Sequence, residues 1–268
     1  KIAETLSMPV MVCVDGFILT HAYERMDVPD QEQVDRFLPP FEPRQVLDPS
    51  DPISIGAMVG PEAFTEVRYM EHHKQLKALE IIPEINKEFK EIFGRDSGGL
   101  ISTYRADDAD TLIVTLGSVI GTISEVIDEM RDKGQKIGAM TIRSFRPFPL
   151  DEIHEVLKKT QRVVVFEKCL AVGLGGIVAN NVRMAHRGLT TPVYTVIGGL
   201  GGRPITRKSL NELFEKAMND DLEETTFLDL KQDVVDHEID RAEKFNRSGA
   251  IAENVLRQIG VVDVAKTS

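Results

Sequence analysis

The stretch Thr111–Glu167 decides the fold of this chain. It reads TLIVTL (111–116), GSVIGTISEVIDEMRDKG (117–134), QKIGAMTI (135–142), RSFRPFPLDEIHEVLKKTQ (143–161) and RVVVFE (162–167). The first, third and fifth segments are short apolar runs, which are typical of parallel strands buried on both faces. The second and fourth segments repeat their apolar residues at helical spacing, with charged residues opposite. This alternation predicts an α/β fold, with an open, mainly parallel sheet flanked by helices and right-handed crossovers.

Turn and cap residues mark the ends of these elements. Gly117-Ser118 turns the chain after the first strand, and Ser118 or Thr122 is expected to cap the following helix. Lys133-Gly134 ends that helix with a basic last turn and a glycine stop. Further along, the sequence predicts a helix over 176–186, a strand over 192–197, a helix over 207–218 that Thr206 caps, and an acidic tail with one amphipathic helix over 237–258.

The first 94 residues have a less regular pattern. Ile2–Leu6 predicts a last helical turn and Met8–Val14 a buried strand, so the chain begins inside a βα repeat. We therefore expect an N-terminal part to be missing, the alternative being a natural short form. The proline-rich residues 27–56 predict a linker, with at most a short helix near 31–37. A loop is expected over 54–70, and a long helix over 71–93 that Pro83 kinks or divides.

Composition excludes several classes of partner. The chain has 268 residues and a net charge of −11, which argues against nucleic acid or an anionic membrane as the main partner. No apolar run approaches the length of a membrane span. Cys13 and Cys169 are the only cysteines, so the sequence has no zinc or iron–sulfur motif, and two isolated thiols indicate a reducing, cytoplasmic compartment.

Two pairs of polar residues are candidates for a site. Asp15 and His21 follow the predicted strand 8–14 and would line a site, although a local turn and local packing are the favoured interpretation. Arg143 and Arg146 follow a parallel strand, where they would bind phosphate or carboxylate or, equally, hold an interface.

The glycines at 173–176 open a helix as a phosphate-binding turn does, but close packing is the favoured explanation for them. Two other groups invite a metal interpretation. The acids at 107–110 are more typical of a solvated loop than of a cation site, and His72-His73 lacks chelating geometry, so we predict no metal site and no catalytic residue on this chain.

The chain resembles the alpha subunit of the 2-oxoacid:ferredoxin oxidoreductases, and among these the pyruvate enzymes most. The stretches that carry this resemblance are MPVMVCVDGFILTH (8–21), GPEAFTEVRYM (60–70), YRADDADTLIVTLGSVIGT (104–122), KGQKIGAMTIRSFRPFP (133–149) and GGLGGRPITRKSL (198–210). The elements DGF-x-x-x-H and R-x-FRPFP are the most specific. The resemblance covers roughly 1–218 and leaves the tail unmatched.

The resemblance implies four regions. Residues 1–26 would end a domain that binds the pyrimidine of thiamine diphosphate, and 27–94 would be a linker and long helix. Residues 95–218 would form a transketolase carboxyl-terminal-like α/β domain, and 219–268 an acidic helical tail.

The resemblance also implies a reaction. The family oxidises a 2-oxoacid with coenzyme A to acyl-CoA and CO₂, or runs the reverse synthesis, and passes electrons through [4Fe-4S] clusters to ferredoxin. Thiamine diphosphate, Mg²⁺ and the clusters would belong to the whole complex, with beta, gamma and ferredoxin-like delta subunits as partners. This chain would bind none of the cofactors alone and would shape the site rather than catalyse.

Within that family, Arg143, Arg146 and Arg203 are candidates to contact the phosphates of coenzyme A. Two other interpretations stay open. One is an independent nucleotide-binding α/β domain that uses the glycine turns at 173–176 or 198–202. The other is a subunit of another thiamine enzyme, such as a branched-chain dehydrogenase E1 or a transketolase.

Overall fold

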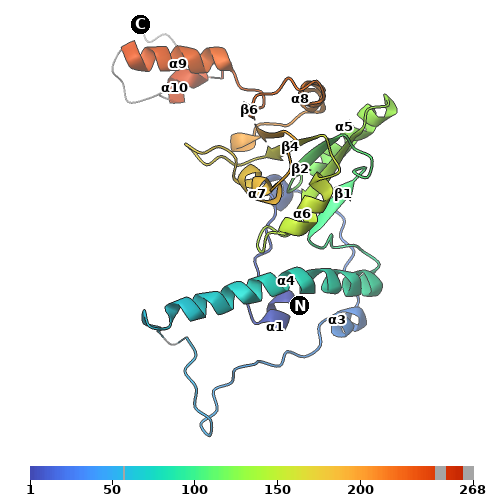
Figure 1. Ribbon diagram of the computed structural model, residues 1–268, viewed down its shortest axis with the longest axis vertical. Helices are drawn as coiled ribbons and strands as arrows, with labels where there is room; N and C mark the ends of the chain where they lie inside the picture. Colours follow the sequence, from blue (N-terminus) through green and yellow to red (C-terminus); the bar gives the residue numbers. More distant parts are fainter. Residues whose placement is uncertain (57, 245–251, 262–268) are drawn as a thin grey trace. The chain divides into compact units, whose positions relative to one another are not determined.

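The computed structural model describes residues 1–56, 58–244 and 252–261. The chain divides into two compact units, Lys1–Thr226 and Phe227–Ser268. Figure 1 shows the sheet that forms the centre of the first unit. Its strands are β1 (Ile101–Tyr104), β2 (Thr111–Thr115), β3 (Ile137–Ile142), β4 (Arg162–Glu167), β5 (Val193–Ile197) and β6 (Thr225–Phe227).

The strand order is β1-β3-β2-β4-β5-β6. Strands β2 to β5 run parallel, and β1 is antiparallel to β3 at one edge. In the centre, Thr111 of β2 is in register with Ile137 of β3 on one side and Arg162 of β4 on the other. The open, mainly parallel sheet that the sequence predicts is therefore confirmed.

Two pairs of helices cover the faces of the sheet (Figure 1). Helix α5 (Ile120–Asp132) packs against α8 (Arg207–Met218), and α6 (Leu150–Leu157) packs against α7 (Ile177–Ala185). Every residue of β2 and β3 is buried, as expected for strands with helices on both faces. Thr206 caps α8 as predicted, because its hydroxyl accepts a hydrogen bond from the Ser209 N–H at 3.1 Å.

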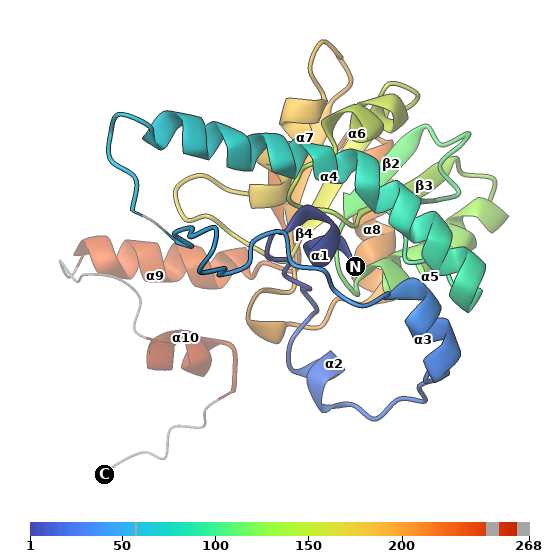
Figure 2. The same ribbon diagram turned by 90° about the horizontal axis from the view of Figure 1, so that it is seen from below.

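A helical layer precedes the sheet in sequence. It consists of α1 (Ile2–Leu6), α3 (Gln31–Phe37) and the long α4 (Phe64–Phe93), which Figure 2 shows crossing in front of the sheet. The ring of Phe37 packs edge-on against Phe89, with 5.5 Å between their centroids, and against Phe93 at 5.4 Å. Lys1 joins the same cluster, since its Nζ donates to the Phe37 carbonyl at 2.8 Å.

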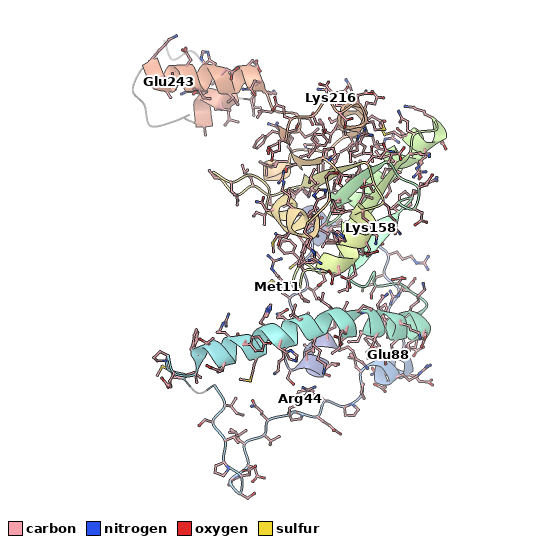
Figure 3. The ribbon with its side chains drawn as sticks, in the orientation of Figure 1. Met11, Arg44, Glu88, Lys158, Lys216 and Glu243 are labelled. Atoms are coloured by element: carbon pink, nitrogen blue, oxygen red, sulfur yellow. The ribbon has the colours of Figure 1, made fainter. Side chains whose placement is uncertain are left out.

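The predicted strand Met8–Val14 is wrong. The structure has no strand there, and the segment runs from α1 toward the sheet with Met11 86% and Val12 85% exposed (Figure 3). A strand needs a neighbour to take up its backbone hydrogen bonds, and no strand in the described residues pairs with this segment. The segment has the apolar pattern of a strand, but that local pattern does not show whether a neighbouring strand is present to pair with it.

Other boundaries also differ from the sequence predictions. Helix α4 begins at Phe64, where a loop was expected, and it continues through Pro83 without division. A proline removes one helical hydrogen bond, and the packing of α1 and α3 on α4 offsets that loss. Strand β1 lies in a polar region for which the sequence analysis predicts no strand. Neither Ser118 nor Thr122 caps α5, whose N-cap position is Val119.

The second unit is described by α9 (Gln232–Lys244) and α10 (Ala252–Gln258). The buried carboxylate of Glu238 accepts from Gln258 Nε2 at 2.7 Å and pairs with Arg241 at 3.4 Å. The prediction of one helix over 237–258 is therefore replaced by two helices, and its middle part, 245–251, lies outside the described residues. None of the helices in the described part of the chain combines the length and apolar character that crossing a bilayer requires.

Candidate functional site at the carboxyl edge of the sheet

The carboxyl ends of β2 to β5 lie on one edge of the sheet. From the carboxyl end of β2 the chain passes through α5 to β3 on one side, and from the carboxyl end of β4 it passes through α7 to β5 on the other side. The connections thus diverge between the neighbouring strands β2 and β4. Open α/β sheets bind ligands in the crevice outside such a switch point. We call the loops around it, 116–119 and 168–176, the switch-point loops.

Asp15 lies at this crevice, although it is far away in the sequence. Its Oδ2 accepts a hydrogen bond from the Ser118 N–H at 2.5 Å, and its Oδ1 lies 3.4 Å from Lys168 Nζ. Hydrogen bonding to Ser118, followed by the charge of Lys168, lowers the pKa of the Asp15 carboxyl below its ordinary value. The local turn favoured for Asp15 from the sequence is therefore wrong, because its carboxylate bonds to both switch-point loops.

Gly117 makes this approach possible. It has φ +82°, a conformation that glycine adopts without strain, and a Cβ there would lie 3.0 Å from Asp15 Oδ2. Helix α5, which starts three residues later, has no side-chain cap and no acid in its first turn. The carboxylate of Asp15 therefore supplies negative charge near a helix N-terminus that lacks its own.

Glu167 performs the same role for α7. This side chain is 2% exposed and ends β4, and its Oε2 accepts from the N–H groups of Ile177 and Val178 at 2.8 Å each. Its Oε1 accepts from the Ala179 N–H at 3.0 Å. Gly176 has no room for a side chain, since a Cβ there would lie 2.1 Å from Glu167 Oε1. A buried carboxylate with three backbone donors is a well-satisfied charge.

Burial and the same carboxylate make Cys169 unreactive. The Cys169 Sγ donates to Glu167 Oε2 at 2.8 Å. Burial, and then the neighbouring Glu167, raise the pKa of this thiol to about 11. A thiol with such a pKa is almost entirely protonated near neutral pH, so it is a poor nucleophile.

The glycine turn at 173–176 therefore does not offer an anion site. The N–H groups that a phosphate would need are already bonded to Glu167. The turn itself is closed by backbone bonds between Ala171 and Gly175, both at 2.8 Å. Close packing, the favoured explanation from the sequence, is confirmed for Gly176.

Arg143 and Arg146 lie together after β3. They line a cavity of about 480 Å³, together with apolar residues of the first segment and of α4, among them Leu6, Met8 and Ile82. Arg146 stacks on the ring of Phe145 at 4.4 Å. Neither guanidinium has a carboxylate at ion-pair distance among the described residues. A cavity of this volume, apolar with two cations at its rim, is typical of small-molecule sites.

Arg203 belongs to a different loop. It follows the short helix η1 (Leu200–Gly202) after β5 and is not part of the cavity that Arg143 and Arg146 line. The structure thus brings two of the three predicted arginines together. Gly199 in this loop has φ +71°, and a Cβ there would lie 2.9 Å from Ile205 Cδ1. The glycine therefore allows the loop to pack closely against Ile205.

His21 remains local. Its Nδ1 lies 2.8 Å from the Phe17 carbonyl and 3.0 Å from Thr20 Oγ1, within the short helix α2 (Ile18–His21). The structure therefore separates the two candidates Asp15 and His21. Of the acids at 107–110, Asp108 pairs with Arg131 at 2.8 Å, and Asp110 accepts a hydrogen bond from Gln161 Nε2 at 2.9 Å. Across the described residues, no three His, Cys, Asp or Glu side chains gather closely enough to hold a metal ion.

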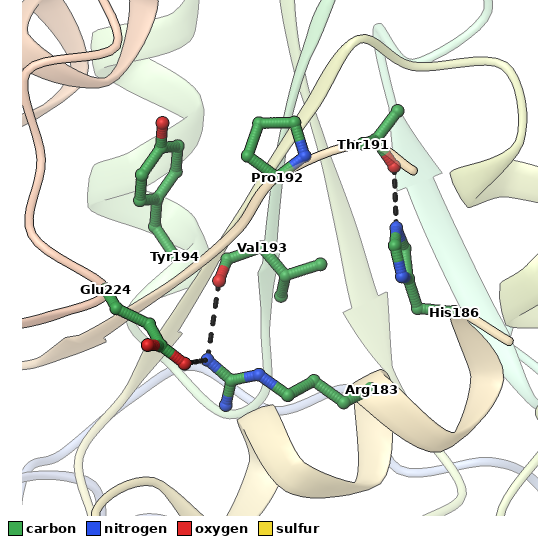
Figure 4. A pocket seen from close by; sticks show the side chains of 7 residues that line it. All are labelled: Arg183, His186, Thr191, Pro192, Val193, Tyr194 and Glu224. Atoms are coloured by element: carbon green, nitrogen blue, oxygen red, sulfur yellow. Dashed lines mark hydrogen bonds and ion pairs between the residues drawn. The ribbon is translucent and has the colours of Figure 1, made fainter. Parts of the chain in front are cut away.

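A second cavity, of about 520 Å³, lies at the amino end of β5 (Figure 4). Arg183 spans it, with its Nη2 3.3 Å from the Val193 carbonyl and 3.5 Å from Glu224. The Nε2 of His186 bonds to Thr191, and burial lowers the pKa of this imidazole. These polar groups bind one another, so the cavity has the character of a packed edge rather than a ligand site.

Sequence reasoning missed Glu167, Ser118 and Lys168 as partners at the edge. One signal was available, since a helix that follows Gly117-Ser118 without an acid in its first turn needs negative charge from elsewhere. No local pattern, however, says which carboxylate provides it.

Two family models match the chain, and they cover most of it. Residues 1–87 match the pyruvate flavodoxin/ferredoxin oxidoreductase thiamine diphosphate-binding domain. Residues 109–210 match the pyruvate:ferredoxin oxidoreductase core domain II. The chain therefore belongs to the 2-oxoacid:ferredoxin oxidoreductase family.

Curated relatives agree with this family. The chain is 39% identical to the pyruvate synthase subunit PorA of Methanosarcina barkeri over 88% of this chain and 61% of that one. It is 40% identical to PorA of Methanothermobacter thermautotrophicus over 84% of this chain and 58% of that one. The ketoisovalerate oxidoreductase subunit VorA of Pyrococcus horikoshii is 36% identical over 80% of this chain and 55% of that one. The chain thus spans about three fifths of the length of these relatives.

Proposed function

We propose that this chain is part of the alpha subunit of a thiamine-dependent pyruvate:ferredoxin oxidoreductase. The enzyme would oxidise pyruvate with coenzyme A to acetyl-CoA and CO₂, passing two electrons to ferredoxin, or run the reverse synthesis. The observation that carries the proposal is the 39–40% identity to pyruvate synthase subunits over more than four fifths of the chain.

The chain's own residues would shape the site and assist assembly rather than catalyse. Two findings support this part of the proposal. The anion sites at the carboxyl edge are taken by Asp15 and Glu167, and the thiol of Cys169 is held protonated. Thiamine diphosphate, Mg²⁺ and the [4Fe-4S] clusters would belong to the whole complex, and this chain alone would bind none of them. We assign these groups to other parts of the complex, including its beta, gamma and delta subunits.

The test is an activity assay with and without partner subunits. The complex should reduce ferredoxin with pyruvate and coenzyme A, and this chain alone should neither decarboxylate pyruvate nor reduce an acceptor. Decarboxylation by the isolated chain would contradict the assignment. Because VorA is 36% identical to the chain, 2-oxoisovalerate belongs in the same assay. A higher kcat/KM for 2-oxoisovalerate than for pyruvate would contradict the assignment of pyruvate as the substrate.

Arg143, Arg146 and Arg203 are proposed to contact the phosphates of coenzyme A in the assembled enzyme. The cavity beside Arg143 and Arg146 supports this for the first two. Charge reversal at either should raise the KM for coenzyme A about tenfold or more and change the KM for pyruvate less than twofold. Arg187→Glu is the control, because Arg187 is exposed and pairs with Asp151 elsewhere on the surface.

The alternative of an independent nucleotide-binding domain predicts the opposite behaviour of the isolated chain. Its melting temperature would rise with NAD(P), FAD or ATP. We expect no shift, because the α7 N–H groups that a phosphate would use are bonded to Glu167.

A further inference from the structure

Asp15 joins two regions that different family models match. It lies within residues 1–87, whereas its partners Ser118 and Lys168 lie within 109–210. The two partners also belong to different loops, one after β2 and one after β4. A single carboxylate therefore holds both sides of the switch point and the segment that leads into it.

The rest of that segment has little else to hold it. Between Met8 and Phe17 the chain forms no helix or paired strand, and Met11, Val12 and Val14 are mostly exposed. The Asp15 carboxylate, by contrast, is only 24% exposed and bonds to a backbone N–H and an ammonium. Gly117 is shaped for this contact, since a side chain there would crowd Asp15.

We propose that Asp15 is a positioning residue that fixes the segment 8–21 on the switch point of the sheet. Its ionised carboxylate occupies the place where sheets of this class bind an anionic ligand, so the segment is docked there as an internal ligand. The proposal rests on contacts within this chain and does not depend on the reaction proposed above.

The contact has a definite pH dependence. Ser118 donates a backbone N–H, and Lys168 is the charged side chain that faces the carboxylate. Both favour the ionised form, so the folded pKa of Asp15 is lower than its unfolded one. The docked state is therefore favoured at neutral pH and is lost as the pH falls through the lowered pKa.

The chain provides its own reporter for a test. Cys13 is exposed and lies two residues before Asp15, whereas the thiol of Cys169 has a pKa of about 11. A nitroxide attached to Cys13 of the full chain, with Cys169→Ser keeping a donor to Glu167, reports the motion of the segment. We expect Asp15→Asn to shorten the rotational correlation time of the label at least threefold, and Asp15→Glu to restore part of the immobilisation.

The matched control is Asp27→Asn, which removes an exposed carboxylate that pairs with Arg25 and should leave the label as in the parent protein. Lys168→Gln removes the weaker contact and should give an intermediate effect. Acid titration of the parent needs no change at Asp15, so it tests the idea even if Asp15→Asn fails to fold. A label that is equally immobile in Asp15→Asn and in the parent, or that stays immobile through the acid titration, would overturn the proposal.

Discussion

At the scale of single residues, two carboxylates determine the character of the carboxyl edge. Glu167 bonds to three N–H groups of α7, and Asp15 bonds to the N–H of Ser118 just before α5. The two helices have no side-chain cap of their own. The positions that would receive a phosphate in a nucleotide-binding sheet are thus filled from within the chain.

Removing the Glu167 side chain should be costly, because it leaves buried N–H donors without a partner. We expect Glu167→Ala to lower the free energy of unfolding by about 3 kcal/mol or more, since each unsatisfied buried donor costs ~1–3 kcal/mol. Urea unfolding followed by circular dichroism measures this. Glu167→Gln keeps the shape and should cost less.

Glu215→Ala is the control for this prediction. Glu215 is an exposed carboxylate on α8 and its removal should leave the urea midpoint unchanged. If Glu167→Ala unfolded at the same urea concentration as this control, the role given to Glu167 would be wrong.

Neither carboxylate could be assigned from the sequence. Glu167 looks like the last residue of a strand, and Asp15-Gly16 looks like a local turn. Their partners are hydrogen-bond donors brought close by folding, in the case of Asp15 at a separation of 103 residues along the chain. The arginines were different, because the end of a parallel strand has a known location, and Arg143 and Arg146 indeed lie together at that edge.

At the scale of elements, hydrophobic periodicity was sufficient to predict those strands and helices whose neighbours follow from the alternation of strand and helix itself. The apolar runs of β2, β3 and β4 and the helices between them agree with the structure to within a few residues. The predictions for residues 8–14 and for β1 were wrong for opposite reasons. The first has a strand pattern without a paired strand, and the second lies in a polar region that pairs with β3. Strand formation depends on the neighbour, which local sequence does not reveal.

Two glycines in neighbouring elements test how tightly these elements pack. Gly121 lies on the exposed side of α5, where a Cβ would meet nothing within 4 Å, whereas a Cβ on Gly138 of β3 would lie 2.3 Å from the Arg105 carbonyl oxygen. We expect Gly121→Ala to stabilise the protein by ~0.5–1 kcal/mol, since glycine is unfavourable inside a helix.

Gly138→Ala should instead destabilise it by ~1–3 kcal/mol, because the added methyl forces backbone apart in the core. The same chemical change therefore has opposite signs at the two positions, and chemical denaturation of both variants beside the parent measures this. Equal effects of the two substitutions would contradict the packing described for β3.

At the scale of the whole molecule, the first unit has a complete core of its own. The α5–α8 and α6–α7 pairs cover the sheet, and side chains of β2, β4, α6 and α7 form one buried cluster. The second unit has its own buried contact, in which Glu238 binds Gln258 and Arg241. The first unit thus holds the core that a separately folding part requires.

A chain that ends after Leu230 should therefore keep the fold of the first unit. It lacks α9 and α10 but retains every helix that covers the sheet, so its main melting temperature should stay within ~2 °C of the parent, a shift that corresponds to less than ~1 kcal/mol in a domain of this size. Calorimetry of the two chains gives both values. A matched deletion inside the first unit, from Arg207 onward, removes α8 and should abolish the transition. It takes the fully buried side chains of Leu210 and Phe214 out of the core and exposes the side chains that they cover. If the chain ending after Leu230 also lost its cooperative transition, the independence of the first unit would be wrong, since the sheet would then need α9 and α10 for its stability.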